Sequence, residues 1–449
     1  MTRYPTHADA LVVGGGISGM QAALDLADQG YQVALVEREP SIGGKMAALS
    51  KVFPTLDCCS CITTPKMSAV AHHDNIHLLT YCEVDFIKRR DDGFTVGLTA
   101  KPRYVDTEAC TGCRQCEYVC PIDVPDPFQM QLSARRAICV PFSTAVPQKA
   151  VLDIEHCLLC GKCEKECPVG AIDFAQEPQT LEITAGAILL ATGFKTTPRD
   201  AKAEYGAGRF PNVIDGMMME RLLAPTGPYL HVLRPSDGKE PGSIAYIQCA
   251  GSRDETLGVT YCSRVCCMYA IKQAMLISGS LPLADITIYF MDIRTFGKGY
   301  EQFYRNAQAM GIEFVKSKVG TIREDEDHSL ILRIESVEGE IGVEERKHDL
   351  VVLSVGMLPG CDLSERYGVS VAEDGFADIS SPNLAPTRTC HPGIFAVGTA
   401  ISPMDIVDSI VTAGAAASEA AAYLESLRTV GNVMPQKALI DETKELVDA

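Results

Sequence analysis

The sequence predicts an α/β protein with two dinucleotide-binding domains and a small α+β domain inserted into the first of them. Three observations support this fold class. A glycine-rich turn, Gly14-Gly15-Gly16-Ile17-Ser18-Gly19, follows an apolar strand near the start of the chain. A second strand-and-helix pattern begins near residue 244. Between the two patterns, residues 110–168 carry two cysteine runs of the same form.

Composition limits the classes of function. A chain of 449 residues can hold two or three domains. Its formal net charge of -18 argues against binding to nucleic acid or to an anionic membrane surface. The sequence shows no export signal and no apolar run near the ~20 residues that span a bilayer. We therefore expect a cytoplasmic protein without direct membrane insertion. Metal centres account for its high count of 19 cysteines better than disulfides do.

The glycine-rich turn has the context of a dinucleotide-binding fingerprint. Residues 10–13 predict its strand, 20–29 its helix and 32–36 a second strand. Gly14 and Gly16 permit a tight turn and the close approach of a pyrophosphate, and Gly19 lets the helix pack on the strand. The phosphates would face the helix N-terminus beside Ser18, and Glu37 would accept hydrogen bonds from ribose hydroxyls. The alternative is a glycine turn without a ligand.

Three later motifs resemble those of flavoprotein disulfide reductases, whose fold is thioredoxin-reductase-like. The first is Ser41-Ile42-Gly43-Gly44-Lys45-Met46, and the second is Ala191-Thr192-Gly193 after an apolar strand. The third is residues 393–398, which end in Gly398 and precede an alanine-rich helix expected over 407–424. The resemblance implies FAD, bound by Gly44, Lys45, Thr192, Gly193, Gly398 and Thr399. Thr399 stands where the superfamily usually has an aspartate, so the usual carboxylate contact is not expected.

The two cysteine runs have the form CxxCxxCxxxCP, which is typical of a ferredoxin fold holding two [4Fe-4S] clusters. In that fold the fourth cysteine of each run binds the other cluster. One predicted ligand set is Cys110, Cys113, Cys116 and Cys167. The other predicted set is Cys157, Cys160, Cys163 and Cys120. Zinc sites or disulfides are the alternatives, but zinc sites usually use paired CxxC units rather than triplets with a displaced fourth ligand.

The second nucleotide-binding pattern lacks its phosphate loop. Strands are expected over 244–248, 286–290 and 351–355, with a helix over 270–277. Where a GxGxxA/G motif should stand, the chain reads Cys249-Ala250-Gly251-Ser252-Arg253-Asp254. Four cysteines accompany this change and could hold a third iron–sulfur cluster in the abandoned pocket: Cys249, Cys262, Cys266 and Cys267. The alternative is a group of buried structural thiols.

These patterns divide the chain into five segments. The first part of the FAD-binding domain spans 1–100, and the inserted ferredoxin domain spans 101–180. The FAD-binding domain and a linker continue over 181–241. A degenerate NAD(P)-type domain with the cysteine site spans 242–358. The last part of the FAD-binding domain, with a polar tail, spans 359–449.

As a set, the motifs resemble those of the A subunit of heterodisulfide reductase. The resemblance rests on the flavin fingerprint, the inserted ferredoxin, residues 249–254 and 261–267, and the stretch Thr55-Leu56-Asp57-Cys58-Cys59-Ser60-Cys61. It implies an iron–sulfur flavoprotein oxidoreductase that splits electrons at FAD between a high-potential acceptor and a low-potential ferredoxin. It also implies that the four cysteines from Cys249 to Cys267 hold a cluster beside the flavin, and that Lys272 lies near the reactive edge of the flavin ring. A solvated helix lysine is the alternative for Lys272.

The same resemblance implies partners. These are the other subunits of an anaerobic heterodisulfide-reductase-like complex, a ferredoxin or a hydrogenase or dehydrogenase that supplies electrons, and a second copy of the chain. Many such subunits have an extra N-terminal region or a C-terminal ferredoxin. Neither is recognised in this sequence, so external electrons are expected to enter through another subunit.

Further functions are compatible with these motifs. One is a non-bifurcating electron conduit of a quinone-interacting oxidoreductase or a benzoyl-CoA reductase complex, whose subunits share these motifs. Another is a pyridine-nucleotide disulfide reductase, against which the missing second phosphate loop argues. The group Cys58, Cys59 and Cys61 could be a redox dithiol facing the flavin, could supply a ligand to a partner's cluster, or could simply pack. Four more cysteines are expected to be core thiols: Cys82, Cys139, Cys361 and Cys390.

Overall fold

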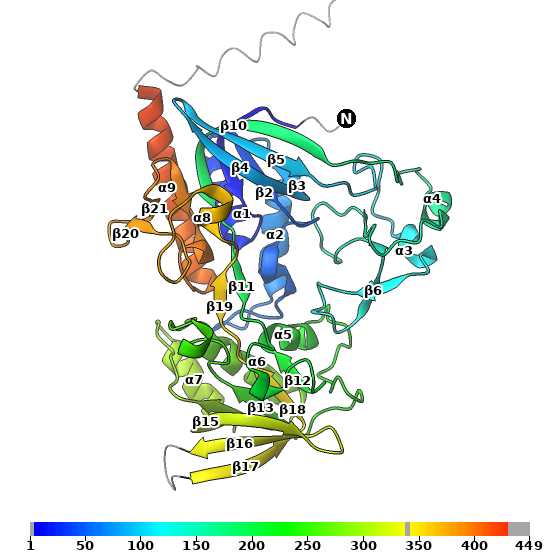
Figure 1. Ribbon diagram of the computed structural model, residues 1–449, viewed down its shortest axis with the longest axis vertical. Coiled ribbons are helices and arrows are strands. Elements are labelled where there is room, and N and C mark those ends of the chain that lie inside the picture. Colours follow the sequence, from blue (N-terminus) through cyan, green and yellow to red (C-terminus); the bar gives the residue numbers. More distant parts are fainter. Residues whose placement is uncertain (1–3, 337–341, 430–449) are drawn as a thin grey trace, which may run out of the picture.

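Figure 1 shows the computed structural model, which describes residues 4–336 and 342–429. Two large α/β units lie end to end, and a small unit containing α3 and α4 lies beside them (Figure 1). The polar tail, residues 430–449, lies outside the described residues. The α/β class and the insertion agree with the prediction from the sequence.

The first large unit is built on a mixed sheet with the strand order β20-β21-β22-β10-β1-β2-β3, to which β5 and β4 add on β10. Strands β22, β10, β1, β2 and β3 are parallel to one another. The central strands are apolar along most of their length because helices and loops bury both of their faces. The strands are β1 (His7–Val13), β2 (Val33–Glu37), β3 (Ile76–Thr80), β4 (Cys82–Arg90), β5 (Gly93–Ala100), β10 (Gln179–Leu190), β20 (Ile379–Ser381), β21 (Ala385–Thr389) and β22 (Ile394–Ala396).

Helices α1 (Ile17–Ala27) and α9 (Ile406–Thr429) pack together against this sheet. Their shared surface consists largely of alanines, among them Ala22, Ala23, Ala413, Ala416 and Ala420, which are all fully buried. Small side chains let the two helix backbones approach closely. The expected alanine-rich helix is confirmed and is a few residues longer than predicted. The same unit also contains α2 (Cys59–Ala71), α8 (Leu363–Tyr367) and the 3-10 turns η1 (Gly44–Ala48) and η4 (Gly398–Ala400).

The second large unit has a sheet in the order β12-β18-β13-β14-β15-β16-β17. Its first five strands are parallel, and β15, β16 and β17 form an antiparallel edge. The strands are β12 (Val213–Asp215), β13 (Ser243–Ile247), β14 (Asp285–Phe290), β15 (Glu313–Glu324), β16 (Leu330–Ser336), β17 (Gly342–His348) and β18 (Leu350–Leu353). The helices are α5 (Gly216–Leu223), α6 (Cys266–Ser280) and α7 (Tyr300–Ala309), with the 3-10 turn η3 (Glu255–Leu257) in the loop before α6.

The inserted unit repeats one short pattern. Helices α3 (Gln115–Val119) and α4 (Lys162–Glu166) each contain the buried third cysteine of a run, and the fourth cysteine caps the helix C-terminus. Two small ladders complete the unit, β6 (Asp123–Pro125) with β7 (Ala134–Arg136), and β8 (Ile138–Cys139) with β9 (Val151–Leu152). Its core is small and includes several of the cysteines themselves. We expect such a core to depend on bound metal for much of its stability.

The two large units are joined by the short ladder of β11 (Phe194–Thr196) and β19 (Met357–Pro359), visible between them in Figure 1. The 3-10 turn η2 (Ala203–Tyr205) follows β11. Arg221 of α5 fixes the arrangement further, because its buried guanidinium donates to Ala48 O of the first unit and to Gln129 Oε1 of the insertion. Among the described residues, no helix combines the length and apolarity required to cross a membrane.

Candidate functional site

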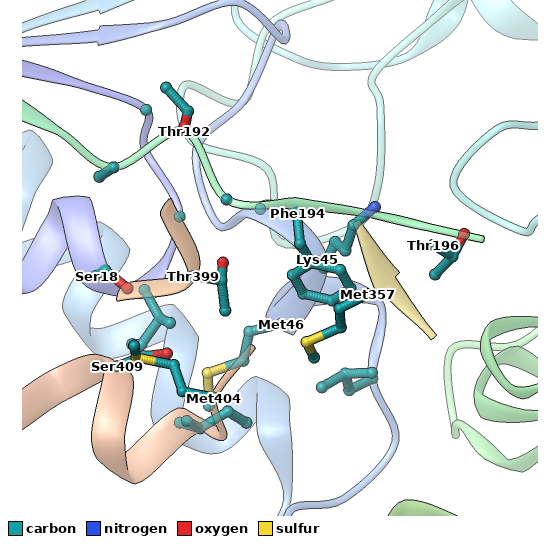
Figure 2. A pocket seen from close by; sticks show the side chains of 18 of the residues that line it. Ser18, Lys45, Met46, Thr192, Phe194, Thr196, Met357, Thr399, Met404 and Ser409 are labelled. Carbon is teal, nitrogen blue, oxygen red and sulfur yellow. The ribbon is translucent and has the colours of Figure 1, made fainter. Parts of the chain in front are cut away.

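A cavity of about 380 Å³ lies between the two large units. Its walls come from the loop after β1, the end of β2, η1, the loop after β10, and the facing surfaces of α5 and α6. Figure 2 shows Ser18, Lys45, Thr192 and Thr399 around it, together with Phe194 and the thioether side chains of Met46, Met357 and Met404. The cavity lies at the carboxyl ends of parallel strands β1, β2 and β10, where open α/β sheets bind their ligands.

The glycine-rich turn is shaped by close backbone contacts. A Cβ on Gly14, whose φ is +109°, would lie 2.2 Å from Ala191 O, and a Cβ on Gly19 would lie 1.8 Å from Gly14 O. A Cβ on Gly16 would meet nothing within 4 Å, and Gly16 lines the cavity. The turn therefore leaves open space beside the N-terminus of α1, as a bound pyrophosphate requires.

Glu37 ends β2 and is buried at the cavity wall. Its carboxylate accepts hydrogen bonds from Gly15 N–H at 2.6 Å and from Glu39 N–H at 2.9 Å. Burial raises the pKa of this carboxyl, and the two backbone hydrogen bonds act in the opposite direction. Each oxygen keeps a free lone pair, so the geometry fits an acceptor for ribose hydroxyls.

The remaining predicted flavin residues divide into two groups. Gly44, Lys45, Thr192, Gly193 and Thr399 line the cavity, as do Gly14, Gly16, Ser18 and Glu37. Gly19 and Gly398 lie behind the wall, where a Cβ on Gly398 would come within 2.1 Å of Ser18 Oγ. Burial lowers the pKa of Lys45, whose ammonium lies 5.2 Å from the centre of the Phe194 ring.

A carboxylate that follows Thr399 was not foreseen from the sequence. Asp405 lines the cavity, accepts the Tyr300 hydroxyl at 2.8 Å and receives the Asp408 N–H at the start of α9. A sequence signal for it exists, because an aspartate at this position, directly before a helical pattern, is typical of a helix N-cap. Asp405 therefore supplies an acidic group to the wall of the same cavity that Thr399 lines.

Lys272 lies on α6 with its side chain only 2% exposed, so the solvated-lysine alternative is wrong. Its ammonium donates to Glu220 Oε1 at 2.5 Å and to Lys51 O at 2.8 Å. Glu220 also accepts from Gln273 and from both the N–H and the hydroxyl of Ser50. Burial would raise the pKa of Glu220, but the Lys272 charge and these hydrogen bonds hold the pKa below its usual value.

Glu220, Tyr269 and Gln273 line the cavity beside Lys272 and were not foreseen from the sequence. Glu220 belongs to the short amphipathic helix α5, and its position on the buried face is set by contact with the first unit. The periodicity of apolar residues along a helix does not predict that a glutamate will face the interior. Only the fold shows that a buried cation lies opposite it on α6.

The four cysteines near the second sheet converge around the start of α6. Cys249 follows β13, Cys262 lies in the next loop, and Cys266 and Cys267 are the first residues of α6. Burial, together with the charges of Cys249 and Cys262, raises the pKa of Cys267 to about 11. Burial and the other three thiols also raise the pKa of Cys266. Thiols that would repel one another as anions are suited to share a positively charged metal centre.

Around these thiols, the backbone N–H of Arg264 donates to Cys262 Sγ at 3.4 Å. No group of three His, Cys, Asp or Glu side chains in the described ranges is close enough for a single metal ion. The thiolates of a cubane stand farther apart than the ligands of one ion, because each holds a different iron.

The cysteine runs of the insertion surround two separate small cavities. One cavity is lined by Cys110, Cys113, Cys116 and Cys167. The other cavity is lined by Cys120, Cys157, Cys160 and Cys163. These are the two ligand sets expected from the sequence, each with one cysteine from the opposite run. The donor chemistry and the exchange of the fourth cysteine both fit a pair of cubanes.

The group Cys58, Cys59 and Cys61 lies at the N-terminus of α2, and none of the three lines the flavin cavity. Cys59 is buried, and burial raises its pKa to about 12. Cys58 accepts the Cys61 N–H at 3.3 Å, and its hydrogen bond with Cys61 lowers its pKa. Cys59 therefore packs in the interior. Exposed Cys61 and part-exposed Cys58 keep their thiols accessible, as a ligand to a partner's cluster requires, but none of the three faces the flavin cavity, as the redox-dithiol interpretation requires.

The four remaining cysteines differ from expectation in part. Cys82 and Cys139 are buried thiols, as predicted, although Cys82 also lines the flavin cavity. Cys390 is exposed, so the prediction was wrong there, because the residue lies just after strand β21 rather than inside the sheet. Cys361 is part-exposed and lines the flavin cavity, so it is not a core thiol either.

Comparison with known proteins tests the assignment of the cofactor segments. Residues 9–57 match the FAD dependent oxidoreductase family, and residues 109–172 match the 4Fe-4S dicluster domain family. The chain therefore has a flavoprotein segment and a dicluster segment where the sequence predicted them. A thioredoxin reductase of T. acidophilum shares the fold, with a TM-score of 0.53 at 16% identity, covering 94% of this chain and 99% of that one.

Two relatives extend the likeness over nearly the whole chain. An iron-sulfur A subunit of the CoB--CoM heterodisulfide reductase of Methanopyrus kandleri is 51% identical over 92% of this chain and 64% of its own length. The chain belongs to the family of heterodisulfide reductase A subunits. Another member, the A subunit of the H(2):CoB-CoM heterodisulfide,ferredoxin reductase of Methanothermobacter marburgensis, is 45% identical over 92% of this chain and 63% of its own length. The chain thus spans about 63% of the length of such relatives.

Proposed function

We propose that this chain is the FAD and iron–sulfur electron-transfer subunit of a heterodisulfide-reductase-like complex. In this proposal the flavin divides electrons between a high-potential acceptor and a low-potential ferredoxin. The proposal rests mainly on the residues that helix α6 places at its two sites. Its first turn holds Cys266 and Cys267, and its next turns present Tyr269, Lys272 and Gln273 to the cavity. One rigid helix thus connects a four-cysteine site to the flavin cavity.

The proposed flavin residues are those of the cavity wall and the turn behind it, named above. FAD, when bound, would exchange an electron pair with one partner and single electrons with iron–sulfur clusters. Lys272 can hold a positive charge beside the cavity because Glu220 compensates it in the absence of ligand. Such a cation stabilises negative charge on a reduced ring, which is why we propose Lys272 as the residue nearest the chemistry.

Two features favour this function over that of a pyridine-nucleotide disulfide reductase. Residues 249–254 replace the second phosphate loop, and Gly251 is the one glycine among them, where a GxGxxA/G motif needs at least two. Cys58 and Cys61 lie outside the cavity wall, where a flavin could not oxidise or reduce them by contact. NAD(P)H binding by the isolated chain would contradict this reasoning.

Partners follow from the relatives' names. Those names mention H₂, a CoB–CoM heterodisulfide and ferredoxin, so we propose that a ferredoxin and a disulfide-reducing protein of the complex receive the electrons. Assembly with a second copy of the chain and a cytoplasmic location are further parts of the proposal. The non-bifurcating conduit differs from it in one measurable property, the order of the flavin potentials.

Anaerobic purification with iron and flavin quantification, followed by a flavin redox titration, tests the proposal. We expect one FAD and about twelve irons per chain, as three cubanes require. We also expect the first one-electron step of flavin reduction at a more negative potential than the second, since only that order lets one electron leave at low potential. The opposite order would support the conduit. About eight irons would exclude the third cluster.

A further inference from the structure

Arg253 lies in the turn that replaces the second phosphate loop, and it contacts the proposed third cluster site. Its φ of +57° is in the left-handed region, which a side chain of this size rarely adopts. Its Nη1 lies 2.5 Å from Asp292 Oδ1 and 3.9 Å from Cys249 Sγ. The guanidinium therefore stands between a carboxylate and a thiol of the cysteine set.

Asp292 follows β14 and approaches the cysteine set from a different element. Its main-chain oxygen accepts from Cys267 Sγ at 3.9 Å, and its carboxylate also pairs with Arg294 at 3.5 Å. The side chains of Arg253 and Asp292 are 24% and 46% exposed, so the pair borders solvent on one side. Burial raises the pKa of the Cys249 thiol, while the Arg253 charge and hydrogen bond act in the opposite direction.

We propose that Arg253 and Asp292 are positioning residues that set the reduction potential of the third cluster through Cys249. The inference rests on the proposed function, because it requires a cluster on the four cysteines. Reduction adds one negative charge to the cluster. A cation that donates to a ligand sulfur stabilises the reduced form, whereas a carboxylate at the next position opposes it.

Because the two residues carry opposite charges, replacing each should move the potential in opposite directions. Arg253→Met removes the cation and the donor but leaves Asp292 beside the site, so the midpoint potential should become more negative. Asp292→Asn leaves Arg253 and Arg294 uncompensated, so the potential should become more positive. Arg253→Lys keeps the charge and should stay close to the wild type. We expect about a ten-fold change in the reduction equilibrium for each charge removal, or about 59 mV for one electron.

The experiment is an EPR-monitored redox titration of the full chain, purified anaerobically with its iron and flavin. The signal of the third cluster is assigned by its loss in Cys266→Ser. Arg323→Met, which breaks a surface pair with Glu345 at the antiparallel edge of the second sheet, is the matched control. This variant should leave the midpoint potential of the third cluster unchanged.

Opposite shifts with unchanged iron content would support the inference. Shifts of the same sign, or no shift at all, would overturn it, since damage to the loop alone would act alike in both variants. If Arg253→Met loses iron, the other two variants still test the inference. Asp292→Asn should then shift the midpoint potential to a more positive value, and Arg253→Lys should leave it close to that of the wild type. A wild-type chain with about eight irons and no third signal would instead overturn the proposed function itself.

Discussion

The ammonium of Lys272 lies 2.5 Å from the carboxylate of Glu220, and their side chains are 2% and 3% exposed. The two residues come from different helices of the second unit, and Ser50 of the first unit completes the carboxylate's hydrogen bonds. A buried ion pair of this kind contributes little net stability, but the loss of one partner is costly because the other charge remains buried. The pair therefore fixes both the cavity wall and the contact between the units.

Lys272→Met should destabilise the chain by about 3–5 kcal/mol. Its buried Glu220 would be left uncompensated, with a pKa raised by burial instead of held low. The double variant Lys272→Met/Glu220→Gln should lose much less stability, because it leaves no uncompensated charge in the interior. Thermal unfolding under anaerobic conditions at neutral pH compares the three proteins. Equal losses in the single and double variants would contradict a compensating ion pair.

Gly14→Ala should impair the stability of the fold, whereas Gly16→Ala should impair the binding of FAD. A methyl group at position 14 would collide with Ala191 O at a φ of +109°, so unfolding should occur at lower temperature even without flavin. A methyl group on Gly16 meets no protein atom but enters the space proposed for the pyrophosphate. That variant should fold normally and retain much less FAD. Flavin content and melting temperature, measured on both, separate the two effects. Normal flavin retention in Gly16→Ala would argue against the proposed phosphate site.

The exchange of the fourth cysteine between clusters can be tested with paired substitutions. Cys120 and Cys160 line one cavity, whereas Cys113 lines the other. Cys120→Ser/Cys160→Ser should therefore impair one cluster and leave the EPR signal of the second intact. Cys120→Ser/Cys113→Ser should impair both. If instead Cys120 and Cys113 proved to serve the same cluster, each run would hold its own cubane and the assignment would be wrong.

The stability of the second unit should fall below pH 6.5. His348 is buried between the Ser243 and Tyr289 hydroxyls, and burial lowers its pKa from 6.5 to about 4. Between these values the unfolded chain binds more protons, so stability decreases as pH falls. At pH 5.5 the loss relative to pH 7.5 should be about 1 kcal/mol. His348→Gln should remove this part of the pH dependence in thermal unfolding, and His77→Gln, at an exposed histidine, should not.

Much of the fold could be predicted from local patterns in the sequence. The glycine turn after β1, the alanine-rich helix α9 and the doubled cysteine runs each depend on residues near one another in the chain, so spacing alone predicted them. Strands β13, β14 and β18 and helix α6 of the second unit were also predicted, although α6 begins four residues earlier than expected, at Cys266. Strand β12 and helices α5 and α7 were not predicted. The antiparallel edge β15–β17 was not predicted, and its outer strand β17 is polar and exposed along most of its length, so it lacks the apolar alternation that marks a half-buried strand.

The sequence by itself determined which groups could serve chemistry: a nucleotide turn, two ferredoxin cysteine sets and four further cysteines. Spacing could do this because a helix turn or a short loop sets the distance between nearby residues. The tertiary structure alone decided what lies opposite them. Glu220 meets Lys272 across 52 positions, and Arg253 meets Asp292 across 39. Such pairs follow from the packing of distant helices and strands, and no local pattern encodes which charged side chain will lie opposite another.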